Sequence, residues 1–477
     1  MAEYLSPGVF IEDSPNPPVI EAVSASTGGF LGIAQRGKVG TPIFIDSWNA
    51  YINKFAHGMS SPFLANSDLA YAVYGFFQNG GKRCYVLRVA GESAQTAVLD
   101  KTSESGLHVK AKDEGAWGNK LKVAVSVNPD VSTHFDMTVT FDGEKVEVFK
   151  GLSNTMGEEN YWIDVLYAQS NYLEGVAGNL TAMEAESLTD GDDGLNDIND
   201  ASYTTALNKF DLVDDVNLMC IPGQTSETVN TGLMSYCDTR KDVFAILDAP
   251  EASTVSSVLA LRKKMSCKNA ALYFPWIKVS DPLSKTGKLR SCPPCGHIMG
   301  VYARTIADRG VWKAPAGTEA IVRGAVDVTT VLSNADTDSL NPAGVVSIIP
   351  KANYGIVVWG ARGLNPDSSM KYISDVLLDI FIKKSVYQST QQFVFEPNDS
   401  VTWTRVTATI QAFLDNLWRD GALLGDSAKE AYYVKCDADL NTASVRSAGK
   451  LICEIGYANK KPAEFVIFRF SHDVASN

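Results

Sequence analysis

One cysteine pair has the residue types and spacing of a known chemical site. Cys292 and Cys295 stand in a Cys-Pro-Pro-Cys motif, the spacing of a redox thiol pair or of half a zinc site. A redox pair needs its first thiol at a helix N-terminus, whereas two prolines favour an extended polyproline segment. The sequence offers no second Cys-x-x-Cys or His-x-His group that would complete a zinc site. We therefore predict that the spacing is incidental, with no metal and no cofactor bound.

His297 is the best candidate for a catalytic base among the five histidines, because it stands beside the expected core strands. A Ser-His-Asp hydrolase needs such a base next to a nucleophilic serine. No serine of this sequence lies in the Gly-x-Ser-x-Gly elbow that exposes the nucleophile of α/β hydrolases. We expect His297 to be a structural residue bonded to nearby backbone, no catalytic residues, and a protein that is not an enzyme.

The segment Asp-Gly-Asp-Asp-Gly at residues 190–194 resembles a fragment of a calcium-binding loop. It lacks the glutamate that such a loop carries at a fixed downstream offset. We therefore predict a solvated turn that leads into the next group of strands.

The charge of the chain argues against one broad class of partner. Its 477 residues carry a formal net charge of −13, whereas nucleic-acid binding requires a basic face that displaces counterions. The opening MAEYLSPG lacks the parts of a signal peptide, and no apolar stretch approaches the roughly 18 residues that span a bilayer. We expect no direct nucleic-acid binding, no membrane insertion, and folding in a cytoplasm with the eight cysteines mostly buried and reduced.

Apolar strands that alternate with helix-length segments predict a mostly parallel α/β core. The runs VNLMCIPG, DVFAILDAP and AALYFPWIKV start at residues 216, 242 and 270 and have the composition of buried strands. A helix over residues 67–77, a glycine turn and a strand over residues 84–89 extend the pattern toward the N-terminus.

A β-rich stretch interrupts this pattern. LKVAVSV, FDMTVTF and EKVEVFK read as strands, and Asp142-Gly143 between the last two predicts a hairpin. We predict a mixed α/β, multidomain fold with a small inserted all-β domain; one sheet continuous with the first region is the alternative. The expected domains are an N-terminal arm at 1–23, the first part of the core at 24–94, the inserted domain at 95–187, a central α/β domain at 188–344 and a C-terminal domain at 345–477.

The clearest helix of the C-terminal domain spans residues 401–420, with Ser400 as its expected N-cap and Gly421 as its expected C′ residue. Its other face carries Arg405 and Arg419. The apolar stripe of this helix consists of Trp403, Val406, Ile410, Phe413 and Leu417. Before it we expect a helix over residues 375–387, and after it strands over residues 432–436, 451–455 and 464–470.

The residue patterns at both ends of the chain predict β-strands, and no other strand lies nearby in the sequence to pair with either of them. A strand exposes N–H and C=O groups that must find partners. We therefore expect both ends to be donated to neighbouring subunits, as in a polymer. The residues of these exchanged strands are Val9, Phe10 and Ile11 at the start, and Phe465, Val466, Ile467, Phe468 and Phe470 at the finish.

Over nearly its whole length the chain resembles the tail sheath proteins of contractile bacteriophage tails and of related contractile injection particles. The segments that carry the resemblance are YLSPGVFIE, TGGFLGIAQRG, FFQNGGKRCYVLRV, ALYFPWIKVSDP, PPCGHIMGVYAR, RGVWKAPAG, LNPAGV, VVWGARGL, FVFEPNDSVTW, DGALLG and KPAEFVIFRF. The resemblance implies a subtilisin-like but non-catalytic central domain and an outward-facing β-rich domain.

The resemblance also implies a function. Such a subunit polymerises as stacked hexameric rings around an inner tail tube, linked by β-augmentation between neighbours. The rings contract and drive the tube through the target cell envelope to deliver a genome or effectors. A secreted α/β hydrolase or a β-rich adhesin is the alternative function.

Partners and location follow from the same resemblance. The expected partners are further copies of the chain, the tail tube protein, the baseplate and the tail terminator or neck proteins. The expected location is the virion, after assembly in the host bacterial cytoplasm. Arg405 and Arg419 are the candidate tube contacts, with a merely solvated helix face as the alternative.

Overall fold

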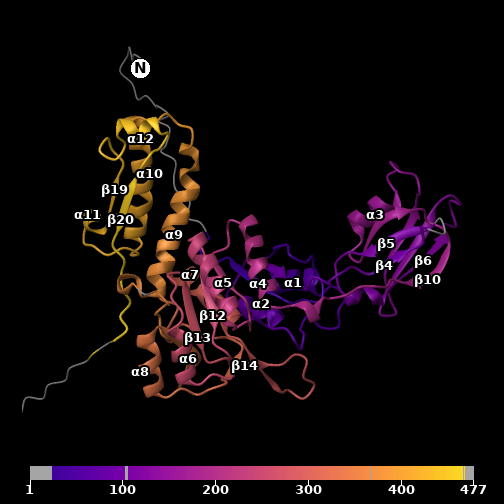
Figure 1. Ribbon diagram of the computed structural model, residues 1–477, viewed down its shortest axis with the longest axis horizontal. Coiled ribbons are helices and arrows are strands. Elements are labelled where there is room, and N and C mark those ends of the chain that lie inside the picture. The colour runs from indigo at the N-terminus through magenta and orange to yellow at the C-terminus, as the bar shows by residue number, and fades with distance from the viewer. Residues whose placement is uncertain (1–23, 103–105, 366, 466, 468–477) are drawn as a thin grey trace, which may run out of the picture. The chain divides into compact units, whose positions relative to one another are not determined.

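The computed structural model describes residues 24–102, 106–365, 367–465 and 467 (Figure 1). These residues divide into two compact units, and the division falls inside helix α9 (Ile373–Thr390). The large unit comprises residues 24–377 and 463–467, and the small unit comprises residues 378–462. Within the described residues, no helix is long and apolar enough to cross a bilayer.

An eight-stranded sheet forms the centre of the large unit (Figure 1). Its six inner strands are parallel, and the strand at each edge is antiparallel to its neighbour. The predicted mixed fold with a mostly parallel core is thus confirmed. In spatial order the strands are β18 (Gly355–Trp359), β17 (Val345–Lys351), β13 (Ala270–Phe274), β12 (Phe244–Asp248), β11 (Leu218–Cys220), β1 (Gly28–Gly32), β3 (Cys84–Arg88) and β2 (Ile43–Ile45).

The central sheet continues past residue 345, where we expected a domain boundary. Strands β17 and β18 complete one edge of the sheet, so the central core continues to at least residue 359. The reason is that β17 pairs with β13, which lies about 75 residues earlier in the chain. Such long-range pairing leaves no local mark in the sequence.

Helices cover both faces of the sheet. Successive side chains of a strand point to opposite sides, so each buried strand packs against helices on both faces. Leu31 of β1 belongs to the cluster formed with α4 (Asp200–Leu207) and α5 (Glu227–Arg240). The neighbouring Phe30 packs against Phe76 on the other side, with ring centroids 5.5 Å apart. The remaining helices of the large unit are α1 (Trp48–Phe55), α2 (Leu69–Gln78), α6 (Val255–Arg262), α7 (Cys295–Arg309) and α8 (Asn334–Ala343). A three-stranded sheet consists of β15 (Leu289–Cys292), β14 (Ile277–Ser280) and β16 (Ala325–Val328).

The residues between β3 and β11 build two further sheets with their own buried cluster around Trp162. They are not part of the eight-stranded sheet, so the alternative of one continuous sheet is wrong. The predicted hairpin turn is confirmed, because Asp142 and Gly143 both have positive φ angles, 51° and 89°. The elements are β4 (Val98–Asp100), β5 (Leu107–Ala111) and β9 (Leu173–Gly178) in one sheet, β10 (Met183–Ser187), β6 (Leu121–Val127), β7 (Phe135–Phe141) and β8 (Glu144–Leu152) in the other, and α3 (Trp162–Gln169).

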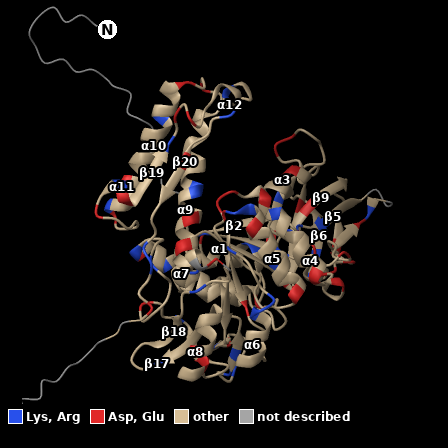
Figure 2. Cartoon of the chain, turned by 60° about the vertical axis from the view of Figure 1, so that its left-hand side comes forward, with Lys and Arg blue, Asp and Glu red and all other residues tan. Residues whose placement is uncertain are grey.

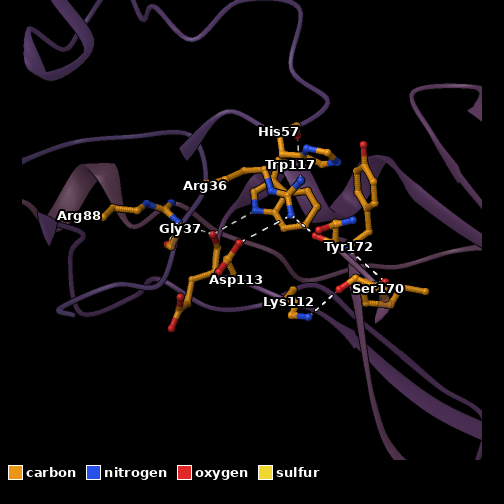
Figure 3. A network of polar contacts seen from close by, with 12 residues as sticks. Arg36, Gly37, His57, Arg88, Lys112, Asp113, Trp117, Ser170 and Tyr172 are labelled. Atoms are coloured by element: carbon orange, nitrogen blue, oxygen red, sulfur yellow. Dashed lines mark hydrogen bonds and ion pairs between the residues drawn. The ribbon is translucent and has the colours of Figure 1, made fainter. Parts of the chain in front are cut away.

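Two buried arginines join this β-rich region to the core (Figure 3). The guanidinium of Arg36 lies 3.8 Å from the ring of Trp117 and donates to the backbone carbonyls of His57 and Asn171. It also pairs with the carboxylate of Asp113 at 3.7 Å. One side chain of the core therefore satisfies backbone acceptors on both sides of the junction.

Arg88, at the end of β3, contacts the core, the β-rich region and the segment that leads back from that region to the core. Its guanidinium donates to the carbonyls of Gly37 at 3.0 Å and Glu114 at 2.7 Å, and pairs with Asp193 at 3.2 Å. The connecting segments themselves lie side by side, since Gln95 and Asp192 exchange both backbone hydrogen bonds at 3.0 Å. The Asp-rich segment, which we expected to be a solvated turn, thus runs antiparallel to residues 95–98, and the carboxylate of Asp193 pairs with Arg88.

The small unit contains a helical hairpin and a two-stranded sheet. Helix α10 (Ser400–Arg419) begins one residue earlier than expected, because Asp399 rather than Ser400 caps it by accepting from the N–H groups of Val401 and Thr402. Gly421 follows the helix with a φ of 85°, as predicted for a C′ glycine. The other elements are the second part of α9, α11 (Ala428–Ala431), β19 (Tyr432–Lys435), α12 (Ala443–Ser447) and β20 (Glu454–Tyr457).

Replacing Arg36 by Met is expected to destabilise the β-rich region by about 2–4 kcal/mol, because buried carbonyls and a carboxylate lose their donor. The measurement is hydrogen–deuterium exchange of strands β5 and β6 in rising urea. The matched control is Arg83→Met, whose ion pair with Asp215 is solvent-exposed and is expected to contribute less than about 0.5 kcal/mol. Equal effects of the two substitutions would contradict the structural role of the junction.

Candidate assembly surfaces

The two-stranded sheet of the small unit presents unpaired backbone edges. Strands β19 and β20 pair only with each other within the described residues, in the antiparallel register Tyr432↔Tyr457 to Lys435↔Glu454. Tyr433 of β19 is 52% exposed. A two-stranded hairpin is at best marginally stable on its own. The outer edge of each strand therefore offers N–H and C=O groups to an additional strand.

An asparagine shortens this hairpin relative to the prediction. The strand expected at residues 451–455 occurs at Glu454–Tyr457. The side chain of Asn441 accepts from the N–H of Ile452 at 2.7 Å and donates to its carbonyl at 2.9 Å. Because a side chain occupies both backbone groups of Ile452, that residue does not join the ladder.

Near the C-terminal end, Glu464 anchors the chain to the large unit. Its carboxylate receives two bonds from Arg362 Nε, at 3.0 and 3.1 Å, and one from Nη2 at 2.6 Å. Tyr372 donates its hydroxyl at 3.1 Å, and Asn341 lies 3.5 Å away. The Glu464 side chain is only 11% exposed. This cluster, which we call the Glu464 anchor, fixes the point from which the last residues of the chain depart.

The anchor is electrostatically favourable at neutral pH. Burial alone would raise the pKa of Glu464, but the hydrogen bonds and charge of Arg362 outweigh it and hold the pKa below the ordinary carboxyl value. The same hydrogen bonds raise the pKa of the Arg362 guanidinium. Both groups are therefore charged across the neutral range.

Beyond the anchor, apolar side chains are exposed. Phe465 is 73% and Ile467 is 78% exposed, and neither lies in a strand. The strand predicted over residues 464–470 is thus not formed by Glu464, Phe465 or Ile467, since an isolated strand has no partner for its backbone. The other predicted exchange residues lie outside the described residues: Val9, Phe10, Ile11, Val466, Phe468 and Phe470.

The two candidate tube-contact arginines lie on the exposed side of α10. Arg405 pairs with Glu396 at 3.3 Å, and Arg419 pairs with Asp415 at 2.7 Å. Fourteen residues separate them along the helix, or about 21 Å at 1.5 Å per residue. Figure 2 shows that both signs of charge are interspersed along the elements of this unit. The structure thus places both guanidiniums in solvent, each beside a carboxylate.

The turn between α9 and α10 carries an exposed aromatic side chain, Phe395, which the sequence pattern does not predict. Phe395 is fully exposed and has a φ of 71°, a left-handed conformation that is unusual for an aromatic residue. Close to it in sequence, Tyr387, Val394 and Val401 are also exposed. The sequence pattern does not reveal this exposure, because Phe395 stands in the apolar run Phe393–Phe395, and apolar residues are most often buried. Backbone strain together with exposed apolar surface is typical of contact sites.

The candidate catalytic base is not accessible to a substrate. His297 on α7 is 2% exposed, and its ring lies so close to Gly75 of α2 that a Cβ at Gly75 would clash with it. Burial lowers the pKa of His297 to about 4. Its Nδ1 has no hydrogen-bond partner among the described residues, so the expected bond to backbone is not formed there. His297 is a packing residue between two helices.

The Cys-Pro-Pro-Cys motif does not form the extended segment that we expected. Cys292 ends β15, and Cys295 is the first residue of α7, since proline readily precedes or opens a helix. The helix N-terminus therefore carries the second thiol rather than the first. Both thiols are fully buried, and burial raises the pKa of each well above its ordinary value. Such thiols are poor nucleophiles.

Replacing Glu464 by Gln is expected to lower the free energy of unfolding of the large unit by about 1.5–3 kcal/mol near pH 7, because a charge-assisted anchor is lost. Since the folded-state pKa is depressed, the ion pair contributes fully above the ordinary carboxyl value of about 4.3. The contribution disappears as the pH falls through the lower folded-state pKa. Thermal unfolding of the two proteins at several pH values measures the difference.

The matched control is Glu319→Gln, which removes the solvent-exposed partner of Arg309. We expect it to change stability by less than about 0.5 kcal/mol at any pH. A difference between the Glu464→Gln variant and the unmodified protein that grows toward acid pH would contradict the assignment.

Comparison with protein families identifies two consecutive sheath domains. Residues 196–364 match the phage tail sheath protein central domain, and residues 365–472 match the phage tail sheath C-terminal domain. A protein of Pseudomonas aeruginosa (strain UCBPP-PA14), provisionally named a prophage major tail sheath protein, is 26% identical over 53% of this chain and 64% of its own length. The tail sheath protein of Salmonella phage ViI is 26% identical over 67% of this chain and 51% of its own length. The chain thus spans about half to two thirds of these relatives.

Solved structures share the fold over almost the whole chain. The sheath of an extracellular contractile injection system (PVC), in its contracted state, has a TM-score of 0.64 and 22% identity, and the match covers 99% of both chains. A sheath tail protein of Listeria innocua has a TM-score of 0.66 and 14% identity, covering 92% of this chain and 96% of the other. With two family domains that together span more than half of the sequence, this chain belongs to the phage tail sheath protein family.

Proposed function

We propose that this chain is the structural subunit of a contractile tail sheath, a role without catalysis. Copies of it assemble as stacked hexameric rings around an inner tail tube. Contraction of the stack drives the tube through the envelope of a target cell and delivers a genome or effectors. The subunit is made in a bacterial cytoplasm and ends in the virion or an equivalent particle.

The observation that carries this proposal is the combination of a two-stranded sheet and apolar chain ends. Strands β19 and β20 offer two free edges, and the chain has two apolar end segments, of which Phe465 and Ile467 are described and exposed. Addition of one strand from each of two neighbours would extend the hairpin to a four-stranded sheet. An eight-residue strand reaches about 26 Å at roughly 3.3 Å per residue, enough to bridge adjacent subunits.

The Glu464 anchor supports a hinge role for the C-terminal end. The anchor holds Glu464 on the large unit, and the exposed Phe465 and Ile467 beyond it would pair with another subunit. Contraction then moves whole subunits as rigid bodies about linked arms. The extended sheath is metastable and is held by a kinetic barrier until it is triggered.

Partners follow from the same arrangement. The polar side of α10, with Arg405 and Arg419, contacts the tail tube protein, and the exposed Phe395 turn adds apolar contact area in the assembly. The β-rich region faces outward. Baseplate and tail terminator or neck proteins bind the two ends of the stack; among the structural neighbours is a chain of the anti-feeding prophage baseplate.

Electron microscopy of the purified full chain tests the function. We expect hollow, ordered tubes, because strand addition links each copy to its neighbours. A variant that lacks residues 1–16 is expected to remain folded by circular dichroism and to form no continuous tubes. Soluble monomers of the full chain would overturn the sheath assignment, whereas normal tubes from the truncated chain would overturn only the N-terminal exchange.

The double substitution Arg405→Glu and Arg419→Glu is expected to weaken attachment to tubes of the tail tube protein by about tenfold or more, since both contacts reverse their charge. Co-sedimentation with preformed tubes measures the attachment. The matched control is Arg83→Glu with Arg309→Glu, two exposed arginines of the large unit, for which attachment stays unchanged. Equal binding by both double variants would move the tube contact to another surface.

A further inference from the structure

Two cysteines stand directly opposite each other at the loop end of the β19–β20 hairpin, just beyond the last pair of the ladder. The ladder pairs Lys435 with Glu454, and in an antiparallel register the next pair is Cys436 with Cys453. Opposed residues of such strands have Cα atoms about 4.5–5.5 Å apart, inside the range of about 4.4–6.8 Å that a disulfide requires.

The two side chains also point to the same face of the sheet. Residues of a strand alternate between faces, so Cys436 lies on the face of Val434, and Cys453 lies on the face of Ile455. Val434 and Ile455 are themselves a cross-strand pair. We propose that Cys436 and Cys453 are a built disulfide site, reduced when the chain is made and oxidised to a cross-strand bond once the protein leaves a reducing compartment.

Their surroundings distinguish this pair from the other thiols. Cys436 and Cys453 are partly exposed, whereas the remaining six cysteines are buried: Cys84, Cys220, Cys237, Cys267, Cys292 and Cys295. Asn441 donates its Nδ2 to the sulfur of Cys436 at 3.7 Å. The same side chain clamps the backbone of Ile452, the neighbour of Cys453. One residue thus holds both sides of the pair in register.

Oxidised glutathione, a small-molecule disulfide, can oxidise the Cys436–Cys453 pair by two thiol–disulfide exchange steps. The Cys436 thiolate attacks one sulfur of oxidised glutathione, which forms a mixed disulfide and expels one glutathione thiolate. The Cys453 thiolate then attacks the Cys436 sulfur, which forms the protein disulfide and expels the second glutathione. The protein loses two protons and two electrons, and glutathione takes up both electrons.

The thiols react slowly near neutral pH. Burial raises the pKa of Cys453 to about 12 and raises the pKa of Cys436 against the lowering effect of hydrogen bonds from Cys453 and Asn441. Because only the thiolate attacks, the rate of exchange is expected to rise about tenfold per pH unit below those values. The disulfide therefore forms gradually after the protein is released from the cell. That release rests on the proposed function, whereas the reaction of the two thiols is independent of it.

Once formed, the bond closes the loop of residues 437–452. Cross-linking restricts the unfolded ensemble and favours the closed hairpin. The sheet that offers edges to neighbouring strands would then persist even when no neighbour is bound. Strand addition requires such a preformed template, so the bond would strengthen the assembled state.

The test uses the purified full chain, incubated with oxidised glutathione at pH 8 and then alkylated under denaturing conditions. Peptide mass mapping is expected to show Cys436 linked to Cys453, and the other six cysteines alkylated. Oxidation is expected to raise the unfolding midpoint of the small unit by roughly 5 °C or more, and reduction is expected to reverse the shift.

The control is the Cys436→Ser and Cys453→Ser double variant, which should keep its fold and show no shift on oxidation. The single variants should give a stable mixed disulfide with glutathione at the remaining cysteine. Alkylation of both cysteines in the oxidised full chain, or a link from either one to a different cysteine, would overturn the proposal whether or not the chain forms tubes.

Discussion

Backbone hydrogen bonding at the edges of β19 and β20 is the constraint on which the small unit depends. The hairpin pairs only four residues with four, and an edge without partners must be solvated or completed. Under the proposed function, strands from other copies complete this sheet, which would account for the apolar sequence at both ends of the chain. Assembly would then be cooperative, because each added subunit would complete a sheet in its neighbours.

The large unit supplies rigidity to this arrangement. Its eight-stranded sheet is covered on both faces, and its last described contact is a carboxylate held by a guanidinium and a phenol. Glu464 is therefore the last described residue whose side chain is held by this unit. Under the proposed function, a stack of such subunits would change its pitch by moving whole bodies.

Local patterns in the sequence predicted the elements well, and long-range contacts explain where they did not. Alternating apolar residues predicted β6 to β8, the Asp-Gly dipeptide predicted the turn at Asp142-Gly143, and the helical spacing of apolar residues predicted the stripe of α10. The place of β17 beside β13 and the contact of Asn441 with Ile452 were missed, because each depends on a partner that sequence spacing does not reveal. The cap at Asp399 was missed for a local reason, since Ser400 beside it is an equally good capping residue. Of the assembly surfaces, the apolar ends were visible in sequence; the Glu464 anchor and the exposed Phe395 were not.

The attachment of the β-rich region has a practical consequence. Its two connecting segments are hydrogen-bonded to each other at Gln95 and Asp192, just where they leave the core. A module that enters and leaves a scaffold through neighbouring backbone positions can be exchanged for another whose termini are equally close. This junction is accordingly a natural graft point, at which another domain can be inserted if it also supplies hydrogen-bond acceptors for Arg36 and Arg88.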